Sequence, residues 1–156
     1  MEIRVTRDMM SDIYFDALRI RNQVFVKEQG VPYELEVGNA LEEASAVHFV
    51  LYDEGVAKGT VRLLTDLDEK TALVQRMAIL KEARGHGYAA ILIDRLIEFA
   101  KETKLNKLEL HAQLSARGLY SKFHFNEVGQ ILKKQGFSIF RWKELILVTN
   151  SLYFLN

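Results

Sequence analysis

Two glycines separated by one residue stand between an apolar run and a long helical pattern. The apolar run covers residues 74–80, the glycines are Gly85 and Gly87, and the helical pattern continues to about residue 100. A helix start carries unpaired backbone N–H groups and about half a positive charge, so it stabilises a phosphate by about 0.3–1 kcal/mol. Glycine lacks a Cβ, so its backbone can approach an anion closely, and Arg84 adds positive charge. The turn is therefore predicted to bind a diphosphate.

The spacing of the turn differs from two common phosphate-binding motifs. The dinucleotide fingerprint requires a third glycine, and the P-loop has the pattern Gly-x4-Gly-Lys-Ser/Thr. The segment Arg84-Gly85-His86-Gly87-Tyr88-Ala89 instead resembles the Arg/Gln-x-x-Gly-x-Gly/Ala signature of the GCN5-related N-acetyltransferases (GNAT). In that family the turn binds the pyrophosphate of acetyl-CoA. The resemblance implies that acetyl-CoA is the cosubstrate.

Composition indicates a soluble globular protein. The 156 residues, 49% of them hydrophobic and 27% charged, suit one domain spanning residues 1–156. A formal net charge of zero argues against a nucleic-acid partner. The absence of cysteine excludes disulfides and thiolate nucleophiles, and the four histidines have no metal-ligand spacing, so no metal is expected. No signal peptide or membrane-length apolar run is present, so we expect a cytoplasmic protein without a membrane partner.

The order of hydrophobic patterns predicts an α/β (mixed α+β) fold. Its central mixed sheet should be mostly antiparallel, contain six or seven strands, and carry helices on both faces. Strands are expected at 2–7, 46–52, 56–65, 71–80, 107–111, 127–134 and 137–147. Helices are expected from Ser11 or Asp12 to about Glu28, after the two glycines, and from about 115 to 124, with an irregular loop at 29–43.

Two groups of charged residues have more than one interpretation. Arg21 lies within an apolar helical stripe, where a structural ion pair is favoured over a ligand contact. The segment 29–43 is rich in acidic residues. It is either a solvated face or a substrate-side rim that attracts an amine. These acidic residues are Glu34, Glu36, Glu42 and Glu43.

Further segments resemble the ElaA/YjcF-like branch of the same family between about residues 15 and 147. They are Arg21–Pro32, Gly59–Leu63, Gln75–Ile79, and Leu110–Gln113 followed by Tyr120–Phe123. The resemblance implies that the backbone of Met77, Ala78 and Ile79 holds the pantetheine and the acetyl carbonyl. It also implies that Gln113 orients CoA or its helix and that Tyr120 is the general acid.

The chain departs from the pattern of that branch at four places. Gln75 and His124 stand where the branch has glycine, and Gly38–Leu41 interrupts its acidic positions. Near the end, Gly136 is followed by Phe137-Ser138-Ile139 rather than by Ile-Pro-His. The departures leave open whether the substrate differs or activity is lost.

Acetyl transfer to an amine needs a polarised carbonyl, an acid for the departing thiolate and a base for the amine. A tyrosine with a pKa of about 10 is protonated at neutral pH, so Tyr120 can donate to sulfur, although a core tyrosine is the alternative. The base is undecided. His48 and His111 are candidates because imidazole titrates near neutrality, although a structural, hydrogen-bonded role is favoured for each. Glu28 or Glu36 could act through water.

The favoured function is an acetyl-CoA-dependent N-acetyltransferase that modifies a primary amine by direct attack in a ternary complex. The alternative is a non-catalytic acyl-CoA-binding module on the same fold. Acyl-homoserine-lactone synthesis uses a related fold, but the chain looks short for it. The acceptor, a small molecule or a protein amine, is left open. The apolar tail Leu152–Leu155 is suited to packing on a second subunit, which would form a homodimer.

Overall fold

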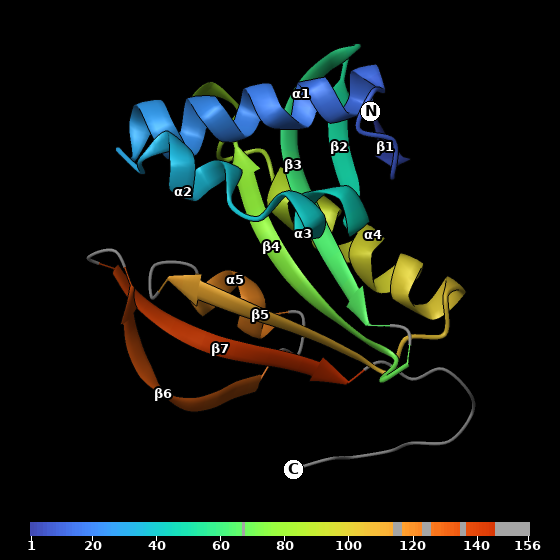
Figure 1. Cartoon of the computed structure of the whole chain (residues 1–156), viewed down its shortest axis with the longest axis vertical. Helices are drawn as coiled ribbons and strands as arrows, with labels where there is room; N and C mark the ends of the chain where they lie inside the picture. The colour runs from blue at the N-terminus through green and yellow to red at the C-terminus, as the bar shows by residue number, and fades with distance from the viewer. Residues whose placement is uncertain (67, 114–116, 123–125, 135–136, 146–156) are drawn as a thin grey trace. The chain divides into compact units, whose positions relative to one another are not determined.

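The computed structural model describes residues 1–66, 68–113, 117–122, 126–134 and 137–145 (Figure 1). Side chains are described for residues 1–66, 68–110, 118, 121 and 122. The elements follow in the order β1 (Glu2–Thr6), α1 (Asp12–Arg21), the π-helix η1 (Asn22–Glu28), α2 (Tyr33–Val37), α3 (Ala40–Ser45), β2 (Val47–Asp53), β3 (Val56–Asp66), β4 (Thr71–Ile79), the 3-10 helix η2 (Lys81–Ala83), α4 (Tyr88–Glu102), β5 (Lys107–Gln113), α5 (Arg117–Lys122), β6 (Asn126–Lys134) and β7 (Phe137–Leu145).

The strands form a mixed sheet in the order β1-β2-β3-β4-β5-β7-β6. Neighbouring strands β1–β2, β2–β3, β5–β7 and β6–β7 are antiparallel, whereas β4–β5 is parallel. The α/β fold with a mostly antiparallel sheet is therefore confirmed. Contacts divide the chain into two compact units. The first contains Met1–Thr65 and Gln75–Arg95, and the second contains Asp66–Val74 and the described residues from Leu96 onward.

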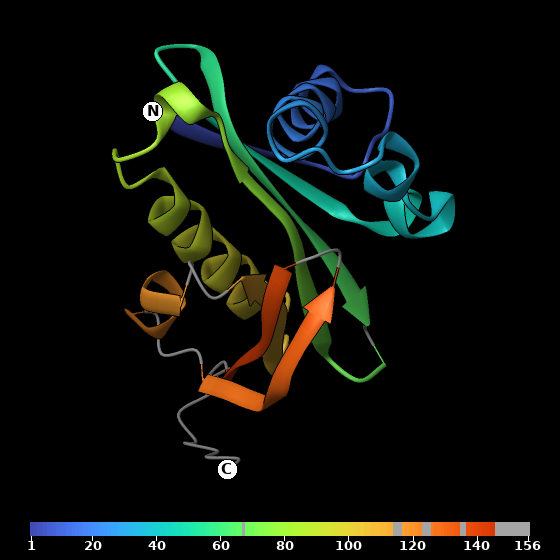
Figure 2. The same ribbon diagram turned by 90° about the vertical axis from the view of Figure 1, so that its left-hand side faces the viewer.

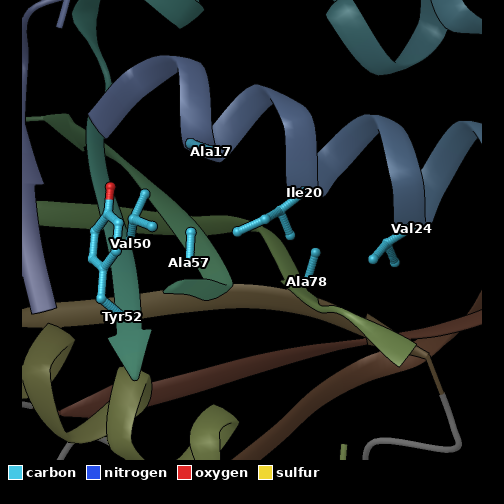
Figure 3. Packing of buried hydrophobic residues seen from close by; sticks show 7 residues of the cluster. All are labelled: Ala17, Ile20, Val24, Val50, Tyr52, Ala57 and Ala78. Carbon is cyan, nitrogen blue, oxygen red and sulfur yellow. The ribbon is translucent and has the colours of Figure 1, made fainter. Parts of the chain in front are cut away.

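In the first unit, helices cover both faces of β2 and β3, as Figure 2 shows for α1 and the first half of α4. Val50 and Tyr52 point toward α1 and join a buried cluster with Ala17, Ile20, Val24, Ala57 and Ala78 (Figure 3). Leu51, on the opposite face of β2, is paired with Gly59 of β3, which approaches Leu92 of α4. Because both faces are covered, β2 is a nearly continuous apolar run rather than an alternating one.

The N-terminal helical region changes helix type part-way along its length. Ser11 caps α1 by accepting a hydrogen bond from the Tyr14 backbone N–H (3.2 Å). The chain is continuously helical from Asp12 to Glu28, which confirms the helix predicted from residue 11 or 12 to about 28. The α-helix ends at Arg21, and the π-helix η1 continues from Asn22. Side-chain periodicity does not separate these helix types over so few residues.

The acidic segment after η1 contains two short helices, α2 and α3, where an irregular loop was predicted. Asn39 begins α3 because its side-chain oxygen accepts hydrogen bonds from the backbone N–H groups of Leu41 (2.8 Å) and Glu42 (3.3 Å). Helices of five or six residues are too short to be stable by themselves. Hydrogen bonds from Arg21 to Glu36 of α2 and Glu43 of α3 hold them in place.

In the second unit, residues 71–74 of β4 pair in parallel with residues 107–110 of β5, and β5 pairs with β7 along its length. Ala72, Val74, Leu108 and Leu110 are buried. Residues 114–116, where a helix was predicted to begin, and His124, where it was predicted to end, lie outside the described residues. Residues 135–136, between the last two predicted strands, and the tail Leu152–Leu155, on which the homodimer prediction depends, lie outside them as well.

None of the helices in the part of the chain that the structure describes has the length and apolar character needed to span a bilayer.

Candidate functional site

The predicted diphosphate-binding turn links β4 to α4 through η2. The Ala83 backbone N–H donates to the Leu80 carbonyl (2.8 Å), and the Ile91 N–H donates to the Gly87 carbonyl (3.2 Å) at the start of α4. Gly85 and Gly87 have φ values of +83° and +77°, in the left-handed region that favours glycine. A Cβ at either position would meet no atom within 4 Å. The backbone conformation, rather than a tight contact within the protein, therefore requires glycine here.

The start of α4 fits an anion. The helix has 15 residues, and the N–H groups of its first turn, including those of Tyr88 and Ala89, have no partner within the helix. The helix dipole adds partial positive charge at this end. Gly85 to Gly87 are exposed, and the two glycines present open space, so backbone donors can be approached from outside. The described residues are consistent with the predicted diphosphate site.

Arg84 forms an ion pair with Glu28, which was predicted to act on the substrate side of the site. Its Nη1 and Nη2 donate to Glu28 Oε1 (2.5 Å) and Oε2 (2.8 Å), and its Nε donates to the Ile79 carbonyl (3.1 Å). The paired hydrogen bond raises the pKa of Arg84 and lowers the pKa of Glu28. Glu28, a substrate-side candidate, is thus joined to the turn by a two-point ion pair. An anion at the turn would compete with Glu28 for Arg84.

His86 and Tyr88 contribute side-chain contacts that hold the turn. Their rings stack with centroids 5.4 Å apart, and the His86 Nδ1 lies 3.1 Å from the carbonyl oxygens of Ala83 and Arg84. The Tyr88 hydroxyl donates to Asp53 Oδ2 (2.5 Å), and this hydrogen bond raises the pKa of Tyr88. The first residue of α4 is therefore anchored to the end of β2.

The second half of β4 contains the predicted acyl-binding residues. Ala78 is buried in the core cluster, whereas Met77 and Ile79 are partly exposed. β3 lies close to this segment. A Cβ added at Gly59 would be 2.5 Å from Ile79 Cδ1 and 3.3 Å from the Ala78 carbonyl oxygen. The Leu80 N–H donates to the Lys58 carbonyl (3.0 Å).

Strand alternation in β4 is interrupted at Arg76, whose φ is +57°. This left-handed conformation costs a non-glycine residue about 1–2 kcal/mol. Regular alternation would send neighbouring side chains to opposite faces. Instead, Gln75 Oε1 accepts from Arg62 Nη2 (2.7 Å) and Arg76 Nη2 donates to the Glu36 carbonyl (3.3 Å). Both side chains thus reach the same charged cluster.

That cluster connects α1, α2, α3, β3 and β4. Glu43 accepts from Nη1 of Arg21 and Nη1 of Arg62, and it accepts from the Tyr14 hydroxyl at 3.0 Å. Glu36 Oε1 accepts from Arg21 Nε at 2.6 Å. Burial by itself would raise the pKa of Glu43, but the hydrogen bonds and charges of the arginines lower it below its ordinary value. The structural ion pair predicted for Arg21 is confirmed.

The interpretation of the acidic segment as a solvated face is wrong for Glu36 and Glu43. Each is only 4% exposed, whereas Glu34 and Glu42 are exposed. The acidic sequence pattern alone could not distinguish the buried Glu36 and Glu43 from the exposed Glu34 and Glu42. The one signal available was Arg21 in an apolar stripe, which requires a buried carboxylate somewhere in the chain.

His48, a candidate base, is buried on β2. Its Nε2 donates to the Glu43 carbonyl (3.2 Å), and its ring contacts Tyr14 edge-on at 4.8 Å. Burial lowers the pKa of His48. These are the contacts of a structural histidine.

Three predicted site residues belong to the second unit. The backbones of His111 and Gln113 lie in β5 and that of Tyr120 lies in α5, but their side chains are outside the described part of the structure. Among the residues that are described, there is no group of three or more His, Asp or Glu side chains arranged to hold a metal.

The protein is therefore an α/β protein with a mixed sheet, in which β4 leads through two left-handed glycines into α4. The model of the acetyltransferase (GNAT) family matches residues 8–125. The N-acetyltransferase YjcF of Bacillus subtilis, which is uncharacterized, is 30% identical over 115 residues, covering 74% of this chain and 79% of YjcF. The chain belongs to the acetyltransferase (GNAT) family. It is therefore an acyltransferase with a CoA-linked cosubstrate.

Solved structures show the same fold. An acyl-CoA N-acyltransferase from Pseudomonas aeruginosa superposes with a TM-score of 0.80 at 22% identity, covering 91% of this chain and 97% of that one. ElaA of Escherichia coli superposes with a TM-score of 0.79 at 19% identity, with the same coverage. The predicted resemblance to the GNAT family, with relatives of the ElaA and YjcF type, is confirmed.

Proposed function

We propose that the chain is an acetyl-CoA-dependent N-acetyltransferase that modifies a primary amine by direct attack in a ternary complex. Residues 1–156 would form a single acetyltransferase domain. The observation that carries the proposal is the turn from Arg84 to Ala89, in which two left-handed glycines lead into the start of α4. This geometry offers backbone N–H groups and a helix dipole to a diphosphate.

The binding roles follow the family resemblance. The backbone of residues 84–89 holds the pyrophosphate of acetyl-CoA, and the backbone of Met77, Ala78 and Ile79 holds the pantetheine and the acetyl group. N–H groups of Met77 and Ala78 polarise the acetyl carbonyl, which is where negative charge develops in the transition state. Gln113 orients CoA.

In the reaction, the neutral amine nitrogen attacks the acetyl carbon, so that an N–C bond forms and the C–S bond breaks. Tyr120 donates a proton to the departing thiolate, and a base removes the proton from the amine. Glu36 and His48 are buried in structural contacts, which argues against either as the base. The remaining candidates are Glu28, which is paired with Arg84 in the structure, and His111. The acceptor is a small molecule or a protein amine.

Calorimetry with CoA and acetyl-CoA tests the cofactor assignment, and release of CoA thiol tests transfer. The acceptor panel contains a small amine, a polyamine, an amino sugar and a lysine peptide. Tyr120→Phe should lower turnover about 10²–10⁴-fold, the range for loss of general acid catalysis, while CoA affinity stays within about twofold.

Gly87→Glu should abolish CoA binding through steric block and charge repulsion. Gly55→Glu is the matched control, because Gly55 also has positive φ (+78°) and open space around its Cβ position. If the unmodified chain gives no heat with CoA at millimolar concentration, the proposal is overturned. If CoA binds but no amine releases thiol above background hydrolysis, the chain is an acyl-CoA-binding module instead.

A further inference from the structure

Arg76 lies at the edge of the charged cluster, and its positive charge is the least well balanced by nearby carboxylates. The cluster contains three guanidinium groups, from Arg21, Arg62 and Arg76, but only two buried carboxylates, from Glu36 and Glu43. Glu43 is shared by Arg21 and Arg62, and Glu36 is hydrogen-bonded to Arg21. Arg76 therefore shares a carboxylate that is already engaged.

The contacts of Arg76 are long or incomplete. Its Nη2 donates to the carbonyl oxygens of Leu35 and Glu36, at 3.3 Å each. Its Nε is buried and has no hydrogen-bond partner, and the nearest carboxylate oxygen in its ion pair, Glu36 Oε1, is 3.5 Å away. A buried donor without a partner is unfavourable and calls for an explanation.

The electrostatic balance around Arg76 favours an additional anion. Desolvation lowers the pKa of Arg76, and repulsion from Arg62 and Arg21 lowers it further. A third carboxylate, Glu42, lies 3.8 Å from Arg62, but its side chain is 51% exposed and so is screened by water. Three positive charges against two buried negative ones leave an excess of one, which a single negative group would neutralise.

The position of Arg76 connects this excess charge with the proposed reaction. Arg76 directly precedes Met77, whose backbone N–H is proposed to bind the acetyl carbonyl, and consecutive Cα atoms are about 3.8 Å apart. The Arg76 side chain is 27% exposed, so solvent reaches it. Its left-handed backbone is the kind of strained conformation that concentrates at functional sites.

We propose that Arg76 binds a carboxylate of the acceptor, so that the preferred acceptors are amines that also carry a carboxylate group. The inference rests on the proposed N-acetyltransferase function. A carboxylate is planar and matches the two-donor edge of a guanidinium. It also carries the single negative charge that balances the cluster, whereas a phosphate monoester would carry close to two.

The first test uses the unmodified chain and pairs of primary amines that differ in a carboxylate. Suitable pairs are γ-aminobutyrate with butylamine and phenylalanine with phenethylamine, and the readout is release of CoA thiol from acetyl-CoA. We expect kcat/KM to be at least tenfold higher for the carboxylate-bearing member of at least one pair. This comparison does not depend on the folding of any variant.

The second test compares Arg76→Gln with Arg76→Lys. A hydrogen bond to a charged group corresponds to a roughly 10- to 100-fold effect, so Arg76→Gln should lower kcat/KM for the carboxylate-bearing amine by that factor. It should leave the simple amine and CoA affinity within about twofold. Arg76→Lys should restore part of the preference. The matched control is Arg19→Gln, because the Arg19 side chain is 71% exposed and forms a salt bridge with Asp16 of the same helix.

The outcomes distinguish failure of the carboxylate inference from failure of the proposed function. Equal transfer to both members of every pair by the unmodified chain would overturn the carboxylate inference while leaving acetyl transfer intact. An equal loss for both members in Arg76→Gln would also overturn it, because that pattern is a structural effect. Failure of the unmodified chain to bind CoA would overturn the proposed function and the inference with it.

Discussion

Glu43→Gln removes one negative charge from the centre of the cluster and changes the shape of the side chain little. In the unmodified chain, the Glu43 carboxylate accepts hydrogen bonds from Arg21, Arg62 and the Tyr14 hydroxyl while only 4% exposed. The substitution leaves Arg21 and Arg62 buried with Glu36 as the remaining buried carboxylate. Removing one partner of a buried ion pair costs about 3–5 kcal/mol.

Because glutamine retains an oxygen that can accept a hydrogen bond, we expect the loss of stability to lie at the lower end of this range, about 3 kcal/mol. For a chain of this length, each kcal/mol corresponds to about 2–4 °C, so Tm should fall by about 6–12 °C. The assay is thermal and urea unfolding followed by circular dichroism. Glu42→Gln is the matched control, since the same chemical change at a half-exposed neighbour should cost about 1 kcal/mol or less.

The dependence of stability on pH gives an independent check. The pKa of Glu43 is lowered in the folded state, so its contribution to stability is present above the ordinary value of 4.5 and is lost as pH falls through the folded-state pKa. Acidification below about pH 4.5 should therefore destabilise the unmodified chain more steeply than Glu43→Gln. The reasoning is refuted if Glu43→Gln and Glu42→Gln differ by less than about 1 kcal/mol.

Three further substitutions test local features. Glu28→Gln releases Arg84, so CoA affinity measured by calorimetry should tighten about two- to fivefold; weaker binding would show that Glu28 supports the site. Tyr14→Phe removes a hydrogen bond to the Glu43 carboxylate and should cost about 1.5 kcal/mol in urea unfolding, whereas an unchanged midpoint would contradict this role. Gly85→Ala places a Cβ at φ +83° without a clash, so we expect a loss of about 1 kcal/mol; a gain in stability would contradict the left-handed geometry.

Local features of the chain could be predicted because their causes lie within a few residues. A Gly-x-Gly turn followed by an apolar helical pattern specifies a helix start, and the structure places that start at Tyr88. The strands on both sides of the Asp53–Gly55 turn follow from apolar runs interrupted by a turn. The roles of the individual site residues in binding and catalysis stay predictions.

Long-range pairing could not be predicted, because nothing in the local pattern names a distant partner. Arg84 and Glu28 are 56 residues apart in the sequence and had been given separate roles. Similarly, Glu36 and Glu42 belong to one acidic run, yet the first is buried against Arg21 and the second is half exposed.

The sequence by itself determined the family, the order of the main strands and helices, and the glycine turn before α4. Hydrophobic periodicity and backbone preference act locally, so they can be read without coordinates. Only the tertiary structure decided which charges are buried, that Arg76 is left-handed, and that its guanidinium joins a cluster with excess positive charge. The burial of a charged group and the net charge around it depend on residues that are distant in the sequence. Those residues become neighbours only when the chain has folded.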